Sequence, residues 1–122
     1  MDATGIFYVF LHVSDLARSK QFYADAVGWT LNTDTPEVGG FMFGSGYLVI
    51  RQDDRPDDQR SYGGGQQVAV LVDDVGATHR QLADAGVEVS AVADQHWGER
   101  NFSFQDPDGY TWVVGKPTTE VR

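Results

Sequence analysis

Three histidines are the side chains of this chain best suited to acid–base or metal chemistry, because it contains no cysteine. His12 lies in an apolar run, His79 in a segment with helical spacing that should leave it exposed, and His96 in a polar loop. A catalytic divalent metal normally takes about three protein ligands and keeps one position open. His12 and His96 lack a third ligand at a matching spacing. We therefore predict no metal site, and interpret His12 as a hydrogen-bonding pocket residue or a buried polar group.

Other catalytic patterns are missing from the sequence. The glycines at 63–65 are followed by glutamines rather than by the Lys-Ser/Thr of a phosphate-binding loop. There is no Gly-x-Ser-x-Gly nucleophile turn. Trp97, by contrast, stands in a polar loop with no apolar periodicity to bury it. Aromatic faces stack on planar ligands, so we expect Trp97 to line a binding pocket.

The elements that must position these residues occur twice along the chain. Residues 6–13 are almost entirely apolar and predict a buried strand, Asp15 suits a helix N-cap, and Gly28 ends an apolar helical stripe. The same order recurs in the apolar run 67–72, with Asp74 as cap and Gly86 as stop. Each helix is followed by three strand-like segments. They are 29–33, 41–43 and 47–52 in the first half, and 87–92, 101–105 and 110–115 in the second.

The length and composition of the chain limit its domain organisation, its possible binding partners and its cellular location. Its 122 residues predict one domain, with a first module over about 6–52, a solvated, charged and glycine-containing linker over 53–65, and a second module over about 66–116. A net charge of −9 disfavours nucleic acid and anionic membrane surfaces as partners. No apolar run approaches the ~20 residues of a membrane span, and the first residues lack the basic start of a signal peptide. We expect a cytoplasmic protein.

Several short motifs give both halves a resemblance to a known family. They are Val13-Ser14-Asp15-Leu16 leading to Ser19, Phe22-Tyr23 and Gly28-Trp29, then Val72-Asp73-Asp74-Val75 leading to Leu82, Ala85-Gly86-Val87, Trp97-Gly98-Glu99-Arg100 and Asp106-Pro107-Asp108-Gly109. From about residue 6 to 116 the chain resembles the vicinal oxygen chelate superfamily, which includes glyoxalases, extradiol dioxygenases, fosfomycin-modifying enzymes and bleomycin-resistance proteins. The resemblance implies an α+β fold in which two tandem βαβββ modules curl their sheets around a shared cavity, with the helices outside.

Strand alternation then divides the side chains between the helices and the cavity. Trp112 and Val114 are expected to pack outward, and Phe102 in the core. The orientation of Trp29, Phe41, Phe43 and Tyr47, further candidates for the cavity wall, stays open. The residues expected to bind a ligand are Tyr8, Phe10, His12, Leu48, Ile50, Gln67, Trp97, Asn101, Ser103 and Val113.

The resemblance also indicates which residues of this chain occupy the positions of the metal ligands in metal-using relatives. These residues are Tyr8, Gln67 and Val113, with Ile50 as the first-module counterpart of Val113. A neutral phenol is a poor ligand, an amide is a weak one, and an aliphatic side chain cannot coordinate. The resemblance therefore implies a site without metal or cofactor.

Three functions are compatible with these observations. The first is metal-free binding and sequestration of a hydrophobic, aromatic natural product by a homodimer, as in the bleomycin- and mitomycin-resistance branch. The second is a lyase, isomerase or dioxygenase acting on a small molecule, with His12 as acid or base or with metal ligands other than those above. The third is a module with only an oligomerisation or regulatory role. We expect the first.

Overall fold

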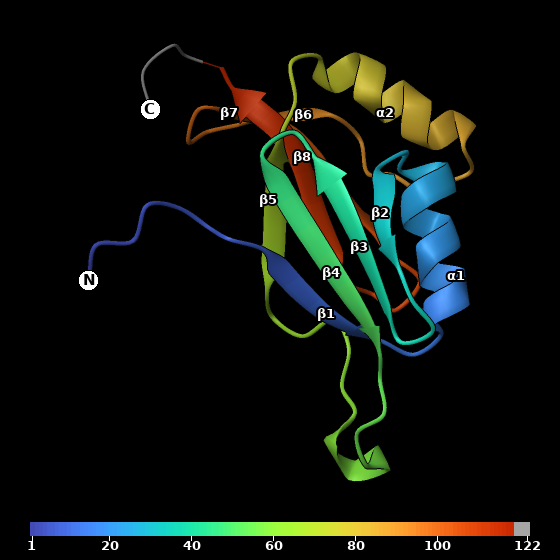
Figure 1. Cartoon of the computed structure of the whole chain (residues 1–122). Coiled ribbons are helices and arrows are strands. Elements are labelled where there is room, and N and C mark those ends of the chain that lie inside the picture. Colours follow the sequence, from blue (N-terminus) through green and yellow to red (C-terminus); the bar gives the residue numbers. More distant parts are fainter. Residues whose placement is uncertain (119–122) are drawn as a thin grey trace. The chain divides into compact units, whose positions relative to one another are not determined.

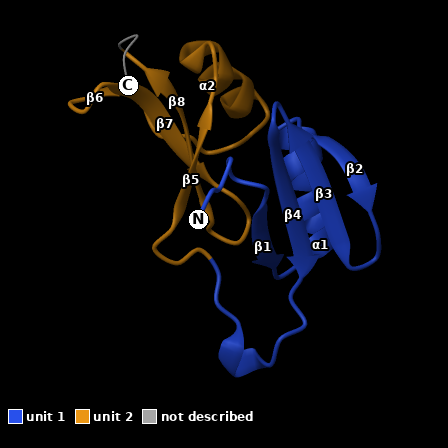
Figure 2. Ribbon diagram, turned by 60° about the vertical axis from the view of Figure 1, so that its left-hand side comes forward, with its two compact units in different colours: residues 1–62 blue, residues 63–122 orange. Residues whose placement is uncertain are grey.

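The computed structural model describes residues 1–118 and separates into two compact units, Met1–Tyr62 and Gly63–Arg122 (Figures 1 and 2). Unit 1 comprises β1 (Val9–Val13), α1 (Leu16–Gln21) with a π-helical turn over Phe22–Ala26, β2 (Thr30–Asp34), β3 (Val38–Phe43), β4 (Gly46–Gln52) and a 3₁₀ turn over Asp57–Gln59. Unit 2 comprises β5 (Gln67–Leu71), α2 (Val75–Asp84), β6 (Ala93–Gln95), β7 (Glu99–Gln105) and β8 (Thr111–Pro117). No helix among the described residues is long and apolar enough to cross a membrane.

The two units repeat one topology. Their strand orders are β1-β4-β3-β2 and β5-β8-β7-β6, and in each the first strand pairs in parallel with the last. Two four-stranded sheets, each with one crossover helix, confirm the predicted α+β class with two βαβββ modules.

The same local signals begin and end both helical segments. The Asp15 carboxylate accepts the backbone N–H of Arg18 at 3.1 Å, and the Asp74 carboxylate accepts that of Ala77 at 2.9 Å. Such caps satisfy an N–H that has no partner inside the helix. Gly28 and Gly86 have φ values of 85° and 86°, which only glycine adopts without strain. The capping residues and stop glycines predicted from the sequence are confirmed.

Each unit has a core between its helix and one face of its sheet. In unit 1 the core residues are Val13, Leu16, Tyr23, Phe41, Leu48 and Ile50, and in unit 2 they are Val75, Leu82, Val87, Phe102, Phe104, Trp112 and Val114. Trp29 stacks on Phe43 with ring centroids 4.1 Å apart, and its ring also lies parallel to that of Tyr23. The outward packing predicted for Trp112 and Val114 is confirmed.

Two predicted strands differ from those observed. β1 begins only at Val9, and the preceding Ile6 and Phe7 are 84% and 86% exposed. Residues 87–92 form no strand beyond a single bridge between Val89 and Phe104. There the Ser90 hydroxyl accepts the backbone N–H of Ser103 at 2.8 Å, the bond that a strand carbonyl would take. A serine side chain that bonds backbone groups competes with the ladder, and β6 forms only at Ala93.

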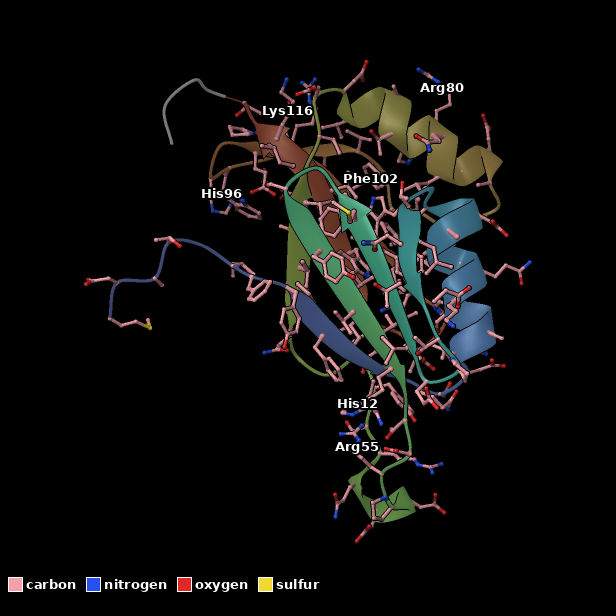
Figure 3. All side chains as sticks on the ribbon, viewed as in Figure 1. His12, Arg55, Arg80, His96, Phe102 and Lys116 are labelled. Atoms are coloured by element: carbon pink, nitrogen blue, oxygen red, sulfur yellow. The ribbon has the colours of Figure 1, made fainter. Side chains whose placement is uncertain are left out.

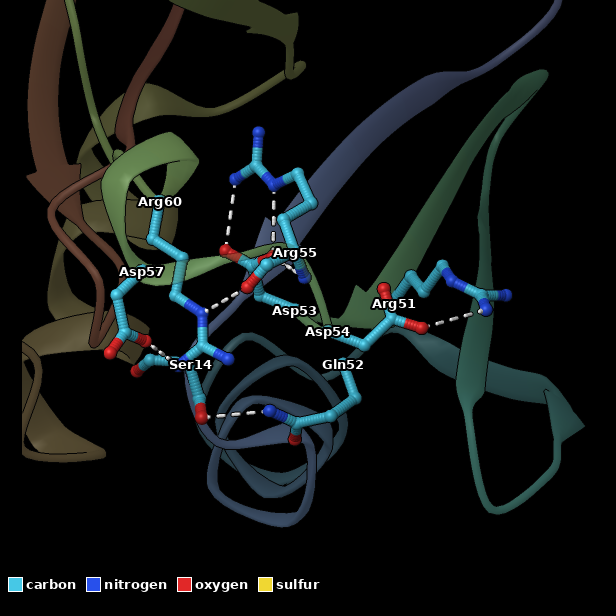
Figure 4. A network of polar contacts seen from close by, with 8 residues as sticks. All are labelled: Ser14, Arg51, Gln52, Asp53, Asp54, Arg55, Asp57 and Arg60. Carbon is cyan, nitrogen blue, oxygen red and sulfur yellow. Dashed lines mark hydrogen bonds and ion pairs between the residues drawn. The ribbon is translucent and has the colours of Figure 1, made fainter.

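The charged stretch after β4 is folded rather than solvated at its start (Figure 4). The Asp53 side chain is fully buried and accepts Nε and Nη2 of Arg55 at 2.8 and 2.9 Å. Hydrogen bonds from Arg55 hold the pKa of the Asp53 carboxyl well below its usual range. The backbone N–H of Asp53 donates to the Val13 carbonyl at 2.8 Å, and Arg60 Nε donates to the Arg55 carbonyl at 2.7 Å. The expectation of a solvated stretch is therefore wrong at Asp53, whereas Asp54 and residues 56–61 are exposed; the stretch up to Tyr62 belongs to unit 1.

Candidate functional site

In each unit the helix packs on one face of the sheet, and we call the opposite sheet face the open face. On unit 1 it is formed by Phe10, His12, Met42, Tyr47, Val49 and Arg51. On unit 2 it is formed by Gln67, Ala69, Leu71, Glu99, Asn101, Ser103, Thr111 and Val113.

The open face of unit 1 is largely aromatic. Phe10 is 43% exposed, and its ring lies edge-on to that of His12 with centroids 5.0 Å apart. Tyr8, just before β1, is 48% exposed. The Tyr47 hydroxyl lies 3.1 Å from the Thr33 hydroxyl, and its ring crosses over Gly40, where a Cβ atom would collide with it. His12 itself is half-buried near the end of β1 (Figure 3).

Leu48 and Ile50 do not belong to this open face, contrary to the prediction. Both are fully buried on the helix side. The register shows why: Phe10 pairs with Val49 just as Ala69, 59 residues after Phe10, pairs with Val113. Val49 is thus the counterpart of Val113, and the prediction was displaced by one residue. Because side chains alternate along a strand, a shift of one residue exchanges the two faces.

Most of the other predicted ligand residues lie where strand alternation places them. Gln67, Asn101, Ser103 and Val113 share the open face of unit 2, and Ser103 and Val113 are direct cross-strand partners. Phe10 and His12 share that of unit 1. That these residues bind a ligand remains a prediction.

The aromatic residues whose orientation was open divide between the two faces. Trp29, Phe41 and Phe43 pack on the helix side, where Tyr23 contacts both Trp29 and Phe41. Only Tyr47 of that group lies on the open face. The rings on the open face of unit 1 are therefore those of Phe10, His12 and Tyr47, and Phe7 and Tyr8 are exposed just before β1.

Trp97 is held in the turn between β6 and β7. Gly98, with φ at 89°, donates its backbone N–H to the Gln95 carbonyl at 3.0 Å, a conformation that favours glycine. On the helix side of this hairpin, the paired residues Asp94 and Arg100 form a bidentate ion pair at 2.6 and 3.1 Å. Hydrogen bonds from Arg100 lower the pKa of Asp94. This short, cross-linked hairpin presents Trp97 with 54% of its surface exposed.

A chain of hydrogen bonds connects Trp97 to the sheet. Its indole Nε1–H donates to Glu99 Oε2 at 3.3 Å, and Asn101 Nδ2 donates to Glu99 Oε1 at 2.8 Å. Gln95 Nε2 donates in turn to Asn101 Oδ1 at 3.0 Å. The His96 ring meets the Trp97 ring edge-on at 4.9 Å. Sequence reasoning missed Glu99, although it lies two residues before Asn101 and must share its face.

A hollow of about 300 Å³ lies at the end of this sheet. Its lining comprises Ala69, Val70, Leu71, Glu99, Gly115, Lys116 and Pro117. Gly115 pairs with both Leu71 and Asn101, and it contributes no side chain between them. Leu71 is 77% exposed. The hollow is therefore mostly apolar, with the Glu99 carboxylate among its lining groups.

The residues at the family's metal positions do not fit a divalent metal. They are a phenol at Tyr8, an amide at Gln67, and valines at Val113 and its counterpart Val49. Within residues 1–118, no three histidine, aspartate or glutamate side chains come together as metal ligands. His79, expected to be exposed, is half-buried, because its Nε2 bonds the Ser90 carbonyl at 2.9 Å and its ring packs edge-on against Phe102. The absence of a metal remains a prediction from residue types.

The sequence and the fold of this chain are similar to those of known proteins. The family model described as Glyoxalase/Bleomycin resistance protein/Dioxygenase superfamily matches residues 5–114. A solved glyoxalase/bleomycin resistance protein/dioxygenase from Nocardioides is 22% identical, with a TM-score of 0.82 over 100% of this chain and 89% of its own. TnmS3, an antibiotic binding protein from Streptomyces sp. CB03234, is 26% identical, with a TM-score of 0.78 over 96% and 98%. A lactoylglutathione lyase from Agrobacterium tumefaciens is 18% identical, with a TM-score of 0.79 over the whole of both chains.

Proposed function

This chain belongs to the glyoxalase/bleomycin resistance protein/dioxygenase superfamily, and from that premise we propose that it binds a hydrophobic, aromatic small molecule without changing it chemically. The binding surface is provided by the open sheet faces, and no metal takes part. In the cell such binding would sequester a toxic natural product.

The observation that carries this proposal is the concentration of exposed aromatic and apolar side chains on the open faces. Phe10, Leu71 and Trp97 are 43%, 77% and 54% exposed, although each has a large apolar surface. Phe10 belongs to unit 1, and Leu71 and Trp97 belong to unit 2; exposed apolar surface of this kind is typical of binding sites. Binding sites for small molecules are typically apolar and aromatic, with few polar groups, and the open face of unit 1 fits this description; that of unit 2 combines Ala69, Leu71 and Val113 with polar residues.

The residues at the family's metal positions, and the likeness to one relative, support binding over catalysis. Tyr8, Gln67 and Val113 leave a divalent metal without adequate ligands. The 26% identity to an antibiotic binding protein extends over nearly the whole chain. The likeness to a lactoylglutathione lyase, at 18% identity, supports the fold alone.

The test is a panel of aromatic natural products screened by thermal unfolding. A ligand at 100 times its Kd adds about 2.7 kcal/mol to the free energy of unfolding. Each compound that raises Tm is then incubated with the protein and recovered for chromatography. We expect saturable binding and recovery of the intact compound.

Formation of a product would contradict the proposal and favour an enzyme. His12 is then the first residue to substitute, because it is the histidine of the open face of unit 1. His12→Gln should abolish turnover if His12 acts as acid or base, and should leave it intact if it does not. A panel in which no aromatic compound changes Tm would also contradict the proposal.

A further inference from the structure

Two hydroxyl groups meet on the open face of unit 1, those of Tyr47 and Thr33. We infer that this pair donates a hydrogen bond to an acceptor oxygen, such as that of a ketone, on the aromatic ligand. The inference rests on the proposed function and deepens it, because it adds an oxygen requirement to the class of ligand.

A β-bulge in β2 brings Thr33 to this face. Leu31 pairs with Phe41, which is buried on the helix side, so simple alternation along β2 would turn Thr33 toward the helix. The register shifts between Leu31 and Thr33, and Thr33 instead pairs with Gly40. Gly40 pairs in turn with Val49 on the open face. Bulges re-aim side chains in this way and are over-represented beside functional sites.

Gly40 leaves the space that the Tyr47 side chain needs to reach Thr33. A Cβ atom at Gly40 would collide with the Tyr47 hydroxyl, and it would also lie 3.0 Å from the Cβ atom of Thr33. The φ of Gly40 is not positive, so close approach rather than backbone conformation requires glycine here. With no side chain in the way, the Tyr47 hydroxyl lies 3.1 Å from Thr33 Oγ1.

The paired hydroxyls keep one proton for a ligand. Each hydroxyl has one proton to donate and lone pairs that accept. A bond between two hydroxyls shares only one proton, so whichever residue donates, the other can donate elsewhere. A phenol is a stronger donor than an aliphatic alcohol, and accepting a bond from Thr33 strengthens the phenolic O–H further. We therefore assign Tyr47 as the donor to the ligand and Thr33 as the positioning residue that orients it.

Unit 2 carries a hydroxyl pair at the same topological place, built from different residues. Val113 is the counterpart of Val49, so its cross-strand partner Ser103 is the counterpart of Gly40. Ser90 lies beside Ser103, since its backbone N–H donates to the Ser103 carbonyl at 2.9 Å. The Ser90 and Ser103 hydroxyls are 3.4 Å apart. The recurrence of one group from unlike residue types favours a role in binding over a role in packing.

Apolar side chains near the pair can hold a ring system. Met42 pairs with Tyr47, and Phe10 lies in the same row of the sheet as Val49 and Gly40. Phe10 and Gly40 are two strands apart, which corresponds to about 10 Å across the face. Phe10 and Met42 are 43% and 49% exposed. A fused aromatic ring system can therefore contact these side chains while its oxygen reaches the hydroxyl pair.

The experiment compares neutral ligands that share one ring system. 1-Acetonaphthone carries a ketone oxygen, 1-ethylnaphthalene has a methylene group in its place, and 2-(1-naphthyl)ethanol carries an alcohol oxygen. Their Kd values are measured by calorimetry. The preference for the ketone is the Kd of the hydrocarbon divided by that of the ketone. The readout is the change in this preference between proteins, because the ratio in any one protein also reflects the different hydrophobicity of the compounds.

Tyr47→Phe removes the proposed donor and keeps the ring. We expect it to lower the preference for the ketone about tenfold, because one hydrogen bond in an apolar site is lost. A fall for the ketone alone would limit the ligand class to ketones, and a fall for the alcohol as well would extend it to alcohols. Either result supports the inference.

Three further variants separate the hydroxyl from its setting. Gly40→Ala keeps both hydroxyls but displaces that of Tyr47, and should also lower the preference about tenfold. Thr33→Val removes the group that orients the phenol, and should lower it about threefold. Tyr110→Phe removes a phenolic hydroxyl just before β8, and should leave the preference unchanged. Thermal unfolding of each variant checks that it is folded.

The outcomes distinguish this inference from the proposed function. If Tyr47→Phe keeps the preference for the ketone, or if Tyr110→Phe lowers it as much, the inference is wrong and binding of aromatic compounds stands. If none of the naphthyl compounds binds, Tyr47→Phe is titrated with a compound from the natural-product panel that raises Tm, and an unchanged Kd contradicts the inference. If the panel also fails, the proposed function is wrong and the inference falls with it.

Discussion

Trp97 and Trp112 have the same side chain in opposite settings, and replacing each by alanine tests the assignment of the binding face. Trp112 is 1% exposed in the core of unit 2, whereas Trp97 is 54% exposed in the β6–β7 turn. Trp97→Ala should weaken binding of 2-(1-naphthyl)ethanol by ~1–3 kcal/mol, or about 5- to 150-fold. Trp112→Ala should instead destabilise the fold.

The stability changes follow from what each ring contacts. Removing a buried tryptophan leaves a cavity and costs ~3–5 kcal/mol. At about 4 °C per kcal/mol for a chain of this size, Tm should fall by roughly 12–20 °C. Trp97→Ala removes one 3.3 Å hydrogen bond to Glu99 and a half-exposed ring, so its cost should be about 1 kcal/mol or less.

Both quantities are measured on the same preparations, by thermal unfolding and by ligand titration. The affinity of Trp112→Ala is taken at a temperature at which it is still folded, and should stay within about threefold of the unmodified protein. Two results would refute the reasoning: normal binding by Trp97→Ala, or a loss of stability in Trp97→Ala as large as that in Trp112→Ala.

Four further predictions concern stability, metal content and assembly. Asp15→Ala and Asp74→Ala should each cost ~1 kcal/mol in thermal unfolding, because each removes a helix N-cap, and their effects should add. Asp53→Asn should destabilise the protein at pH 7. Since folding lowers the pKa of Asp53, its stabilisation is complete above the unfolded value of about 3.8 and is lost as pH falls below it, so the deficit of the variant should shrink in unfolding curves taken below pH 4. Dialysis against zinc, nickel and manganese should leave far less than one equivalent of metal, and one retained equivalent would contradict this. Light scattering should show a homodimer of twice the 13.4 kDa chain mass, because exposed apolar side chains on the open faces, such as Phe10 and Leu71, need cover; the mass of one chain would exclude it.

Local sequence signals were sufficient for the architecture. A cap such as Asp15 or Asp74 bonds a backbone group three residues away, and Gly28 and Gly86 adopt a backbone conformation that other residues avoid. Helix capping and the stop conformation of glycine depend on residues that are close in the sequence, so they can be predicted without knowledge of the fold. Their repetition predicted two βαβββ modules, and the alternation of side chains then assigned Phe10, Gln67 and Val113 to open faces.

The faces of β4 and the role of the charged stretch were decided only in three dimensions. Leu48 and Ile50 are buried because the pairing of β1 with β4 sets the register, and no local feature of β4 reveals that register. Asp53 is buried because its backbone reaches the end of β1, 40 residues earlier in the chain, where Arg55 can enclose its carboxylate.

The bonding of Glu99 shows the same division at the candidate site. Its face follows from strand alternation, but its bonds to Trp97 and Asn101 depend on the tight β6–β7 turn that brings the indole back over the strand. The residue types and their periodicity thus determined which side chains face away from the helices. Which of them meet was decided by strand register and turn geometry, because those depend on contacts between segments that no single segment encodes.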